Sequence, residues 1–191
     1  MSRLKYIGGG VFAPCDLGTW KIKIGFNNGT QGIEKSEKGG YISVSSKGKL
    51  EFTGTADLKE GITILITNSG KITFGDQFSC NRNCCFSSDS KIEFGNDVLL
   101  GWNVNIRTSD GHPVCKVDDE RQILNLARPV RIGNHVWIAA NADILKGVDI
   151  QDNCIIGYRS CVTKSILEKN VVIAGYPARI VKRDIQWRRE L

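Results

Sequence analysis

An aliphatic residue recurs at every sixth position in the second half of the chain, through six consecutive units. The series is Ile132, Ile138, Ile144, Ile150, Ile156 and Val162. Four places after each of these comes a small or aliphatic residue: Val136, Ala142, Val148, Cys154, Ser160 and Ile166. A period of six is not a multiple of the 3.6 residues of a helical turn, so the pattern does not indicate an α-helix.

Polar or glycine-containing stretches, such as residues 133–135 and 151–153, separate these units. A simple alternating strand would need no such corner in every unit. The pattern therefore predicts short strands joined by regular turns. Three such strands form one triangular coil, and stacked coils bury a column of aliphatic side chains.

The same organisation extends toward the N-terminus. The six-residue spacing also joins Phe94, Leu100 and Ile106. Similar four-residue runs recur at steps of 22 and 20 residues, at 49–52, 71–74 and 91–94. Each step matches one coil of about eighteen residues with a small insertion at a corner.

Less regular runs precede residue 51. Residues 21–24 and 41–44 alternate polar and apolar side chains and predict early coils, whereas 27–40, rich in Gly, Asn, Lys and Glu, predicts a loop. We therefore expect three parts: irregular N-terminal β coils (1–50), a β-helix core (51–178, with a loop at 109–128) and a basic C-terminal tail or helix (179–191).

The composition is that of an ordinary soluble domain, with 191 residues, 41% hydrophobic and 24% charged. No apolar run approaches the ~18–20 residues of a membrane span, and the first ten residues lack an apolar leader segment. We expect a cytoplasmic protein without a transmembrane segment.

The seven cysteines are odd in number, and the cluster Cys80, Cys84 and Cys85 has neither a CxxC pair nor a nearby histidine. We interpret them as small core residues rather than disulfides or zinc ligands.

The net charge of +6 bears on the choice of partner. No interleaving of aromatic and basic residues supports binding to nucleic acid. Part of the excess lies between Arg179 and Leu191, where five cations accompany two anions. Such a patch suits a phosphorylated small molecule as well as a polynucleotide.

The chain has two histidines, and they lie in different settings. His112 belongs to the run Ser109–Pro113, where the six-residue register stops until Val130 restarts it. Functional residues concentrate on loops held by a regular scaffold, and imidazole is the natural base near neutral pH. The alternative is a loop histidine that only hydrogen-bonds the backbone. His135 lies at a corner of the repeat, where we expect a structural role.

Three stretches resemble the hexapeptide-repeat acyltransferases, and in particular the maltose, galactoside and polysaccharide O-acetyltransferases. They are Ile132–Ile138 with the units that follow, Ala174–Ile180, and the segment from Phe94 to Val114. The resemblance covers residues 70–182. It implies an all-β fold, a left-handed parallel β-helix with an inserted active-site loop and a short C-terminal helix. It also implies acetyl-CoA as co-substrate, no metal, and a homotrimer with active sites between subunits.

The resemblance assigns roles to particular residues. His112 is the general base, and the backbone N–H of Ala140 stabilises the oxyanion. The residues implied in CoA binding are Trp137, Ala140, Tyr158, Thr163, Lys164 and Arg179. Those considered for the acceptor are Asn81, Trp102 and Asp110, each weighed evenly against a packing or corner role. The sequence departs from the family at Ala139–Ala140, where Gly or Ser is usual, and at Tyr158–Arg159, where small residues are usual.

The function expected on this basis is transfer of an acetyl group from acetyl-CoA to a hydroxyl of a sugar or of a polysaccharide or lipopolysaccharide precursor. An N-acetyltransferase acting on an amino sugar or small amine would need the same base and is the alternative. A non-enzymatic β-helix binding module is a third class. A carbonic-anhydrase-like site is excluded within one chain, because it needs three histidine ligands and the chain has two.

Overall fold

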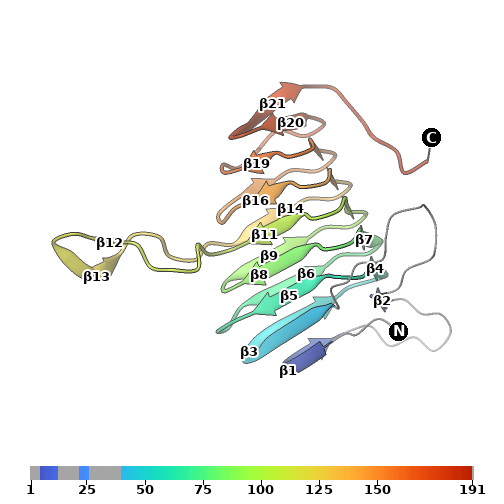
Figure 1. The fold of residues 1–191 in the computed structure, drawn as a ribbon. Coiled ribbons are helices and arrows are strands. Elements are labelled where there is room, and N and C mark those ends of the chain that lie inside the picture. Colours follow the sequence, from blue (N-terminus) through green and yellow to red (C-terminus); the bar gives the residue numbers. More distant parts are fainter. Residues whose placement is uncertain (1–4, 13–21, 26–39, 191) are drawn as a thin grey trace.

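The structure is a computed structural model that describes residues 5–12, 22–25 and 40–190. The chain winds as a stack of three-sided coils, so that strands of successive coils pair in parallel along three flat faces (Figure 1). The first face consists of β5 (Thr63–Ile66), β8 (Cys85–Ser88), β11 (Asn105–Arg107), β16 (Asp143–Ile144) and β19 (Cys161–Val162). The second consists of β6 (Lys71–Phe74), β9 (Lys91–Phe94), β14 (Val130–Ile132) and β17 (Asp149–Ile150).

The third face contains the strands that close each coil. They are β2 (Ile22–Ile24), β4 (Ala56–Leu58), β7 (Phe78–Cys80), β10 (Leu99–Leu100), β15 (Trp137–Ile138), β18 (Ile155–Ile156) and β20 (Val172–Gly175). β21 (Ala178–Lys182) ends this face and runs antiparallel to β20. β3 (Tyr41–Phe52) pairs with β5 through its first half and with β6 through its second, so it turns from the first face onto the second. β1 (Lys5–Phe12) lies beside it.

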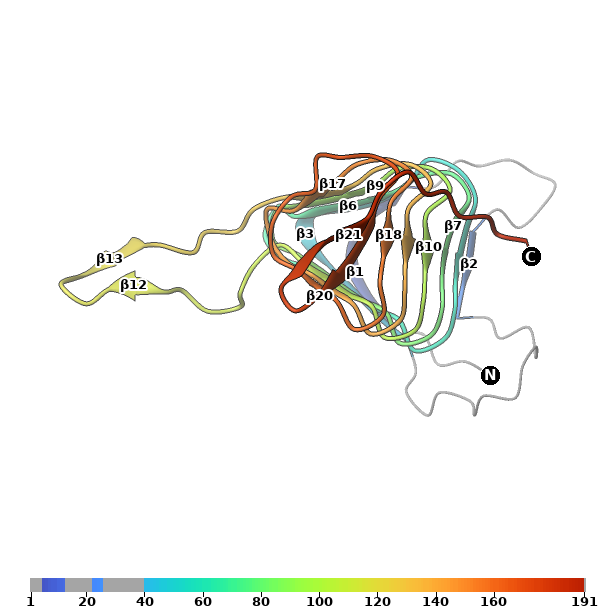
Figure 2. The same ribbon diagram turned by 90° about the horizontal axis from the view of Figure 1, so that it is seen from above.

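The coil is left-handed. Viewed from the C-terminal end, the chain passes from the first face to the second and then the third in a clockwise sense while it rises toward the viewer (Figure 2). Left-handed crossovers between parallel strands are rare in other folds. The prediction of a left-handed parallel β-helix is therefore confirmed.

The six-residue pattern marks the core. Every member of the main aliphatic series is at most 1% exposed, and the residues four places later are at most 9% exposed. The aromatic residues of the earlier coils stack in the same way, with the rings of Phe52 and Phe94 lying 5.2 and 5.1 Å from that of Phe74. The runs at 49–52, 71–74 and 91–94 pair in parallel register, as their recurrence predicts.

The corners use the left-handed backbone region. Ten described residues other than glycine have positive φ between Asn68 and Asn170, and six of them are asparagines. Asparagine tolerates this region because its short side chain bonds locally. Side-chain amides also stack between coils, since Asn103 Nδ2 donates to Asn141 Oδ1 at 3.0 Å. His135, with φ of 52°, occupies one of these corners.

Three expectations need comment. The predicted short C-terminal helix is wrong, because residues 178–182 form β21 and 183–190 contain no helix. The predicted loop at 27–40 lies almost wholly outside the described residues. Four of the described cysteines, Cys80, Cys84, Cys154 and Cys161, are buried as expected, whereas Cys85 and Cys115 are only partly buried. Burial raises the pKa of the Cys80, Cys154 and Cys161 thiols above the ordinary value.

The described part of the chain contains no helix long and apolar enough to cross a membrane. No cluster of three or more His, Cys, Asp or Glu side chains in these ranges is arranged to hold a metal ion.

Candidate active site

One edge of the prism, where the third face turns into the first, collects four of the predicted residues. Corner backbone bonds stack these turns directly: Asn81 N donates to Leu100 O at 3.0 Å, Asn141 N to Trp102 O at 2.8 Å, and Arg159 N to Ala140 O at 3.1 Å. We call this the third–first edge. In register, Trp102, Ala140 and Tyr158 stack in one column of this edge, and Asn81 lies one position earlier in its own turn, level with Gly101.

The backbone around Ala140 fits the predicted oxyanion donor. The flanking amides are committed, since Ala139 N donates to Ile156 O and Asn141 N to Trp102 O, both at 2.8 Å. The amide of Ala140 donates to no backbone carbonyl of the described residues. Gly101 packs against it so closely that a Cβ there would lie 2.5 Å from Ala140 N. Glycine at 101 therefore keeps the backbone at this amide in place.

Two large side chains border this column. Trp102 is 39% and Tyr158 is 60% exposed, and the Arg159 guanidinium lies 5.5 Å from the Tyr158 ring centre. Both aromatic rings are accessible for stacking on a planar or apolar ligand surface. The departure from small residues at 158–159 thus places a cation and an aromatic ring where the family usually has neither.

The His112 loop leaves the prism at a different edge, between the first and second faces. β12 (Cys115–Lys116) and β13 (Asp119–Ile123) form a hairpin that projects well away from the coils (Figure 2). The two ends of the excursion meet at Arg128 N, which donates to Thr108 O at 2.9 Å. His112 and its neighbours 110–113 are exposed. The prediction that the register breaks into a loop is confirmed.

A polar network that the sequence did not reveal fixes the base of this loop. Lys146 Nζ donates to Asp110 Oδ2 at 2.5 Å and to Asn125 O at 2.8 Å. Asn125 Nδ2 donates to the Asp110 carboxylate at 2.9 Å and to His112 O at 2.8 Å. The bonds from Lys146 and Asn125 lower the pKa of Asp110 below its ordinary value. Asp110 therefore contributes to holding the backbone at His112 through Asn125.

The predicted CoA residues lie on different faces and edges of the upper coils, so they do not form one continuous site within a single chain. Trp137 lies on β15 and Arg179 on β21, both on the third face. Thr163 and Lys164 follow β19, on the same edge as the base of the His112 loop. The other two, Ala140 and Tyr158, belong to the third–first edge described above.

The C-terminal cations are not all available to a ligand. Arg183 makes a two-pronged ion pair with Glu168 at 2.7 and 3.1 Å, and Arg189 Nε lies 2.5 Å from Asp97 Oδ1. Two of the five cations in this region are therefore already paired with carboxylates. Both pairings join segments far apart in the sequence, which the local charge pattern could not indicate.

Comparisons with known proteins point to one family. The bacterial transferase hexapeptide family (six repeats) matches residues 129–164. A maltose O-acetyltransferase from Clostridium difficile 630 is 32% identical with a TM-score of 0.61, over 71% of this chain and 69% of that one. A galactoside acetyltransferase in complex with coenzyme A is 28% identical with a TM-score of 0.58, over 73% of this chain and 72% of that one. The polysialic acid O-acetyltransferase of Escherichia coli O1:K1 is 30% identical over 149 residues, 78% of this chain and 45% of that protein.

The chain spans about half the length of the curated relatives it matches, between 45% and 57% of the first three. The match therefore does not extend over each of these relatives as a whole.

Replacing Lys146 by Met tests the loop network. The variant keeps the apolar stem but removes both donor contacts, so we expect hydrogen exchange of amides 109–128 to accelerate severalfold while the core amides are unchanged. Wild type should loosen in the same way on acidification. The lowered pKa of Asp110 means that its contribution is present above the unfolded-state pKa and is lost as pH falls through the folded-state value.

Lys91→Met is the matched control, because Lys91 pairs with Glu93 on the second face, at 2.6 Å. Equal exchange of the loop in both variants would show that Lys146 does not hold it.

Proposed function

The chain belongs to the hexapeptide-repeat acyltransferases, and on that premise we propose that it moves an acetyl group from acetyl-CoA to a hydroxyl of a sugar or of a polysaccharide or lipopolysaccharide precursor. The observation that carries the proposal is the position of His112, an exposed imidazole on a loop that interrupts the coils and is fixed at its base by Asp110, Asn125 and Lys146. The substrates for which the relatives are named, maltose, galactoside and polysialic acid, support a carbohydrate acceptor. The reaction is proposed to occur in the cytoplasm.

The proposed chemistry uses one side chain and one backbone group. The His112 imidazole takes the proton of the acceptor hydroxyl while its oxygen forms a bond to the thioester carbonyl carbon. The Ala140 N–H donates to the oxygen that gains negative charge. When the C–S bond breaks, His112 returns the proton to the departing CoA sulfur. Asn81, Trp102 and Asp110 are proposed to contact or orient the acceptor, and a metal is not part of this scheme.

CoA is proposed to lie along the upper coils. Trp137, Tyr158 and Thr163 supply its apolar and hydroxyl contacts, and Lys164 and Arg179 face its phosphates. The bound coenzyme A of the galactoside acetyltransferase structure supports this class of ligand.

A second copy of the chain is needed to complete this site. The His112 loop leaves the first–second edge, whereas Ala140 lies on the third–first edge. The loop also exposes apolar side chains that a monomer would leave in water, between 45% and 105% exposed: Val114, Val117, Ile123, Leu124 and Leu126. Contiguous exposed apolar groups mark protein interfaces. We therefore propose a homotrimer in which the loop of one copy faces the third–first edge of the next.

The alternative acceptor is an amine, as in an N-acetyltransferase acting on an amino sugar. The same base and oxyanion donor would serve it. No contact of the described residues favours an amine over a hydroxyl. The proposal of a sugar hydroxyl as acceptor is therefore supported by the substrates of the relatives.

The first test is removal of the base. His112→Ala should lower kcat by ~10²–10⁴-fold without unfolding the protein, because the residue is exposed on a loop. Gln122→Ala, an exposed change on the same hairpin, is the control and should retain activity. Near-normal turnover of His112→Ala, followed by release of free CoA thiol, would remove His112 as the base.

The second test concerns CoA. Lys164→Glu or Arg179→Glu should raise the KM for acetyl-CoA about tenfold or more, since a hydrogen bond to a charged group is worth ~1.5–3 kcal/mol. The KM for the acceptor should change little. Lys91→Glu, a charge reversal on the second face, controls for net charge. Calorimetry that detects no CoA binding to wild type would argue instead for a β-helix binding module.

The third test concerns assembly. Light scattering at micromolar concentration should give three times the mass of the chain, and Leu124→Glu combined with Leu126→Glu on the loop should favour the monomer. The dissociated variant should also lose transferase activity, because the proposed site is shared. A wild-type monomer with full activity would contradict both parts.

A further inference from the structure

The last residues of the chain return along the prism instead of continuing the stack. After β21, residues 183–190, which we call the strap, descend beside the edge where the second face turns into the third (Figure 1). Ile185 N donates to Asn170 O at 3.1 Å near the top, Trp187 contacts His135 lower down, and Arg189 reaches Gln77 O at 2.9 Å several coils below. A segment without regular structure is thus held by specific contacts.

The central contact joins His135 to Trp187. Their rings stack with centres 4.2 Å apart and planes inclined by 6°, and Trp187 Nε1 donates to His135 O at 2.9 Å. Trp187 is only 6% exposed. Burying an indole of this size and satisfying its N–H gives the strap an apolar attachment and a directional one.

Both ring nitrogens of His135 face hydrogen-bond acceptors. Nδ1 lies 2.5 Å from Asp97 Oδ2, and Nε2 lies 3.1 Å from Trp187 O. A neutral imidazole has one donor and one acceptor nitrogen, so it satisfies only one of these oxygens. Both bonds form together only in the imidazolium, whose charge the Asp97 carboxylate also favours.

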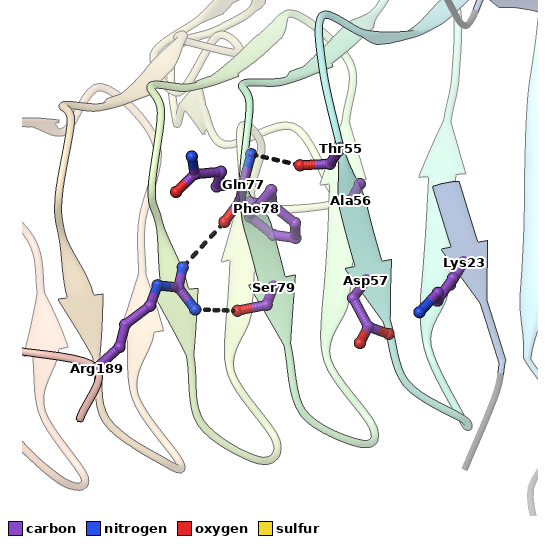
Figure 3. A pocket seen from close by; sticks show the side chains of 8 residues that line it. All are labelled: Lys23, Thr55, Ala56, Asp57, Gln77, Phe78, Ser79 and Arg189. Carbon is purple, nitrogen blue, oxygen red and sulfur yellow. Dashed lines mark hydrogen bonds between the residues drawn. The ribbon is translucent and has the colours of Figure 1, made fainter. Parts of the chain in front are cut away.

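Arg189 attaches the end of the strap through three partners. Its guanidinium donates to Asp97 Oδ1 at 2.5 Å, to Ser79 Oγ at 3.0 Å and to Gln77 O at 2.9 Å. Figure 3 shows the last two bonds, with Arg189 forming one wall of a hollow of about 440 Å³ on the third face. Asp97 therefore links two attachments of the strap: its Oδ1 accepts from Arg189, and its Oδ2 faces His135, on which Trp187 stacks.

The strap also reaches the proposed CoA site. The Trp187 ring lies 6.3 Å from that of Trp137, inclined by 48°, and Trp137 is 37% exposed on β15. One side of the Trp137 indole is thus limited by the strap, while part of its surface remains open to a ligand. A stacking surface with a fixed orientation loses less conformational entropy on binding.

We propose that the strap positions Trp137 for acetyl-CoA, and that it is held in place by His135 in its protonated form. The role of Trp137 as a CoA contact depends on the proposed function, whereas the attachment of the strap does not. Trp187 and Arg189 are positioning residues, because they act on the ligand through Trp137 and the docked strap.

The charged groups around His135 set the direction of the pH response. Asp97 faces it from the corner below, Arg189 bonds that same carboxylate, and the corner above carries Asp152, paired with Lys169 and bonded to Asn134. Burial raises the pKa of Asp97, but the bonds from His135 and Arg189 outweigh it, so the pKa is lower than usual. Attachment therefore requires ionised Asp97 and protonated His135. Deprotonation of His135 removes one of the two imidazole bonds, and the contribution of ionised Asp97 is lost as pH falls through its lowered pKa.

Hydrogen exchange of amides 184–190 in the full chain measures the attachment directly. After correction for intrinsic rates, protection should fall at least tenfold between pH 6 and pH 8.5. In His135→Asn it should be low at both values, because asparagine keeps the positive-φ corner but cannot bond both acceptors. Arg188→Ala, an exposed change within the strap, should behave as wild type. Protection that is independent of pH, or unchanged in His135→Asn, would overturn the protonation requirement.

The kinetic arm tests positioning. His135→Asn and Trp187→Phe should each raise the KM for acetyl-CoA several-fold at pH 6 with a smaller change in kcat, and raising the pH should reproduce this in wild type but not further in His135→Asn. If hydrogen exchange shows that the strap is released while the KM for acetyl-CoA stays constant, the positioning role would be overturned. A protein that binds no CoA in calorimetry but still shows pH-dependent strap exchange would overturn the proposed function and the role of Trp137, and would leave the attachment confirmed.

Discussion

Burial of the same side-chain positions in every coil is the interaction on which the rest of this structure depends. The aliphatic column from Ile132 to Val162 and the stacked rings of Phe52, Phe74 and Phe94 fill the interior of the coils and are almost completely buried. Each coil contributes too little apolar area to be stable alone, so stability arises from the contacts between neighbours. Because the inward positions are fixed, the outward positions, the corners and the insertions are free to carry chemistry.

The residues of the proposed chemistry lie at corners and insertions, where the regular pairing of one coil with the next is interrupted. At the third–first edge, Gly101 lets the backbone around Ala140 approach closely, and the Ala140 amide has no backbone acceptor within the described part of the chain. At the first–second edge the chain leaves the coil for some twenty residues, and the cost of ordering that excursion is offset at its base by Asp110, Asn125 and Lys146. The two edges are separated by a face of the prism, which is the physical reason for proposing that two copies share each site.

The strap illustrates a second use of the corners. His135 occupies a positive-φ position that most corners of its kind fill with asparagine or aspartate. An imidazole there keeps the backbone geometry and adds a ring that stacks, a nitrogen for Asp97 and a nitrogen for the strap. The prediction that His135 has a structural role agrees with its place at a corner of the repeat. Its partners, Asp97 and Trp187, make the proposed attachment of the strap depend on the protonation of His135.

The sequence by itself determined the coil, because a six-residue period of aliphatic side chains has few physical solutions and is visible in the local pattern of the chain. It also located the break at 109–128 and the loop histidine, since both are interruptions of a local pattern. Only the tertiary structure decided which corners align, that Lys146 and Asn125 hold Asp110, and that Arg183 and Arg189 pair with Glu168 and Asp97. The expected C-terminal helix failed for the same reason. The segment is ordered by contacts with residues 15 to 112 positions away, and such contacts leave no periodic trace in the segment itself.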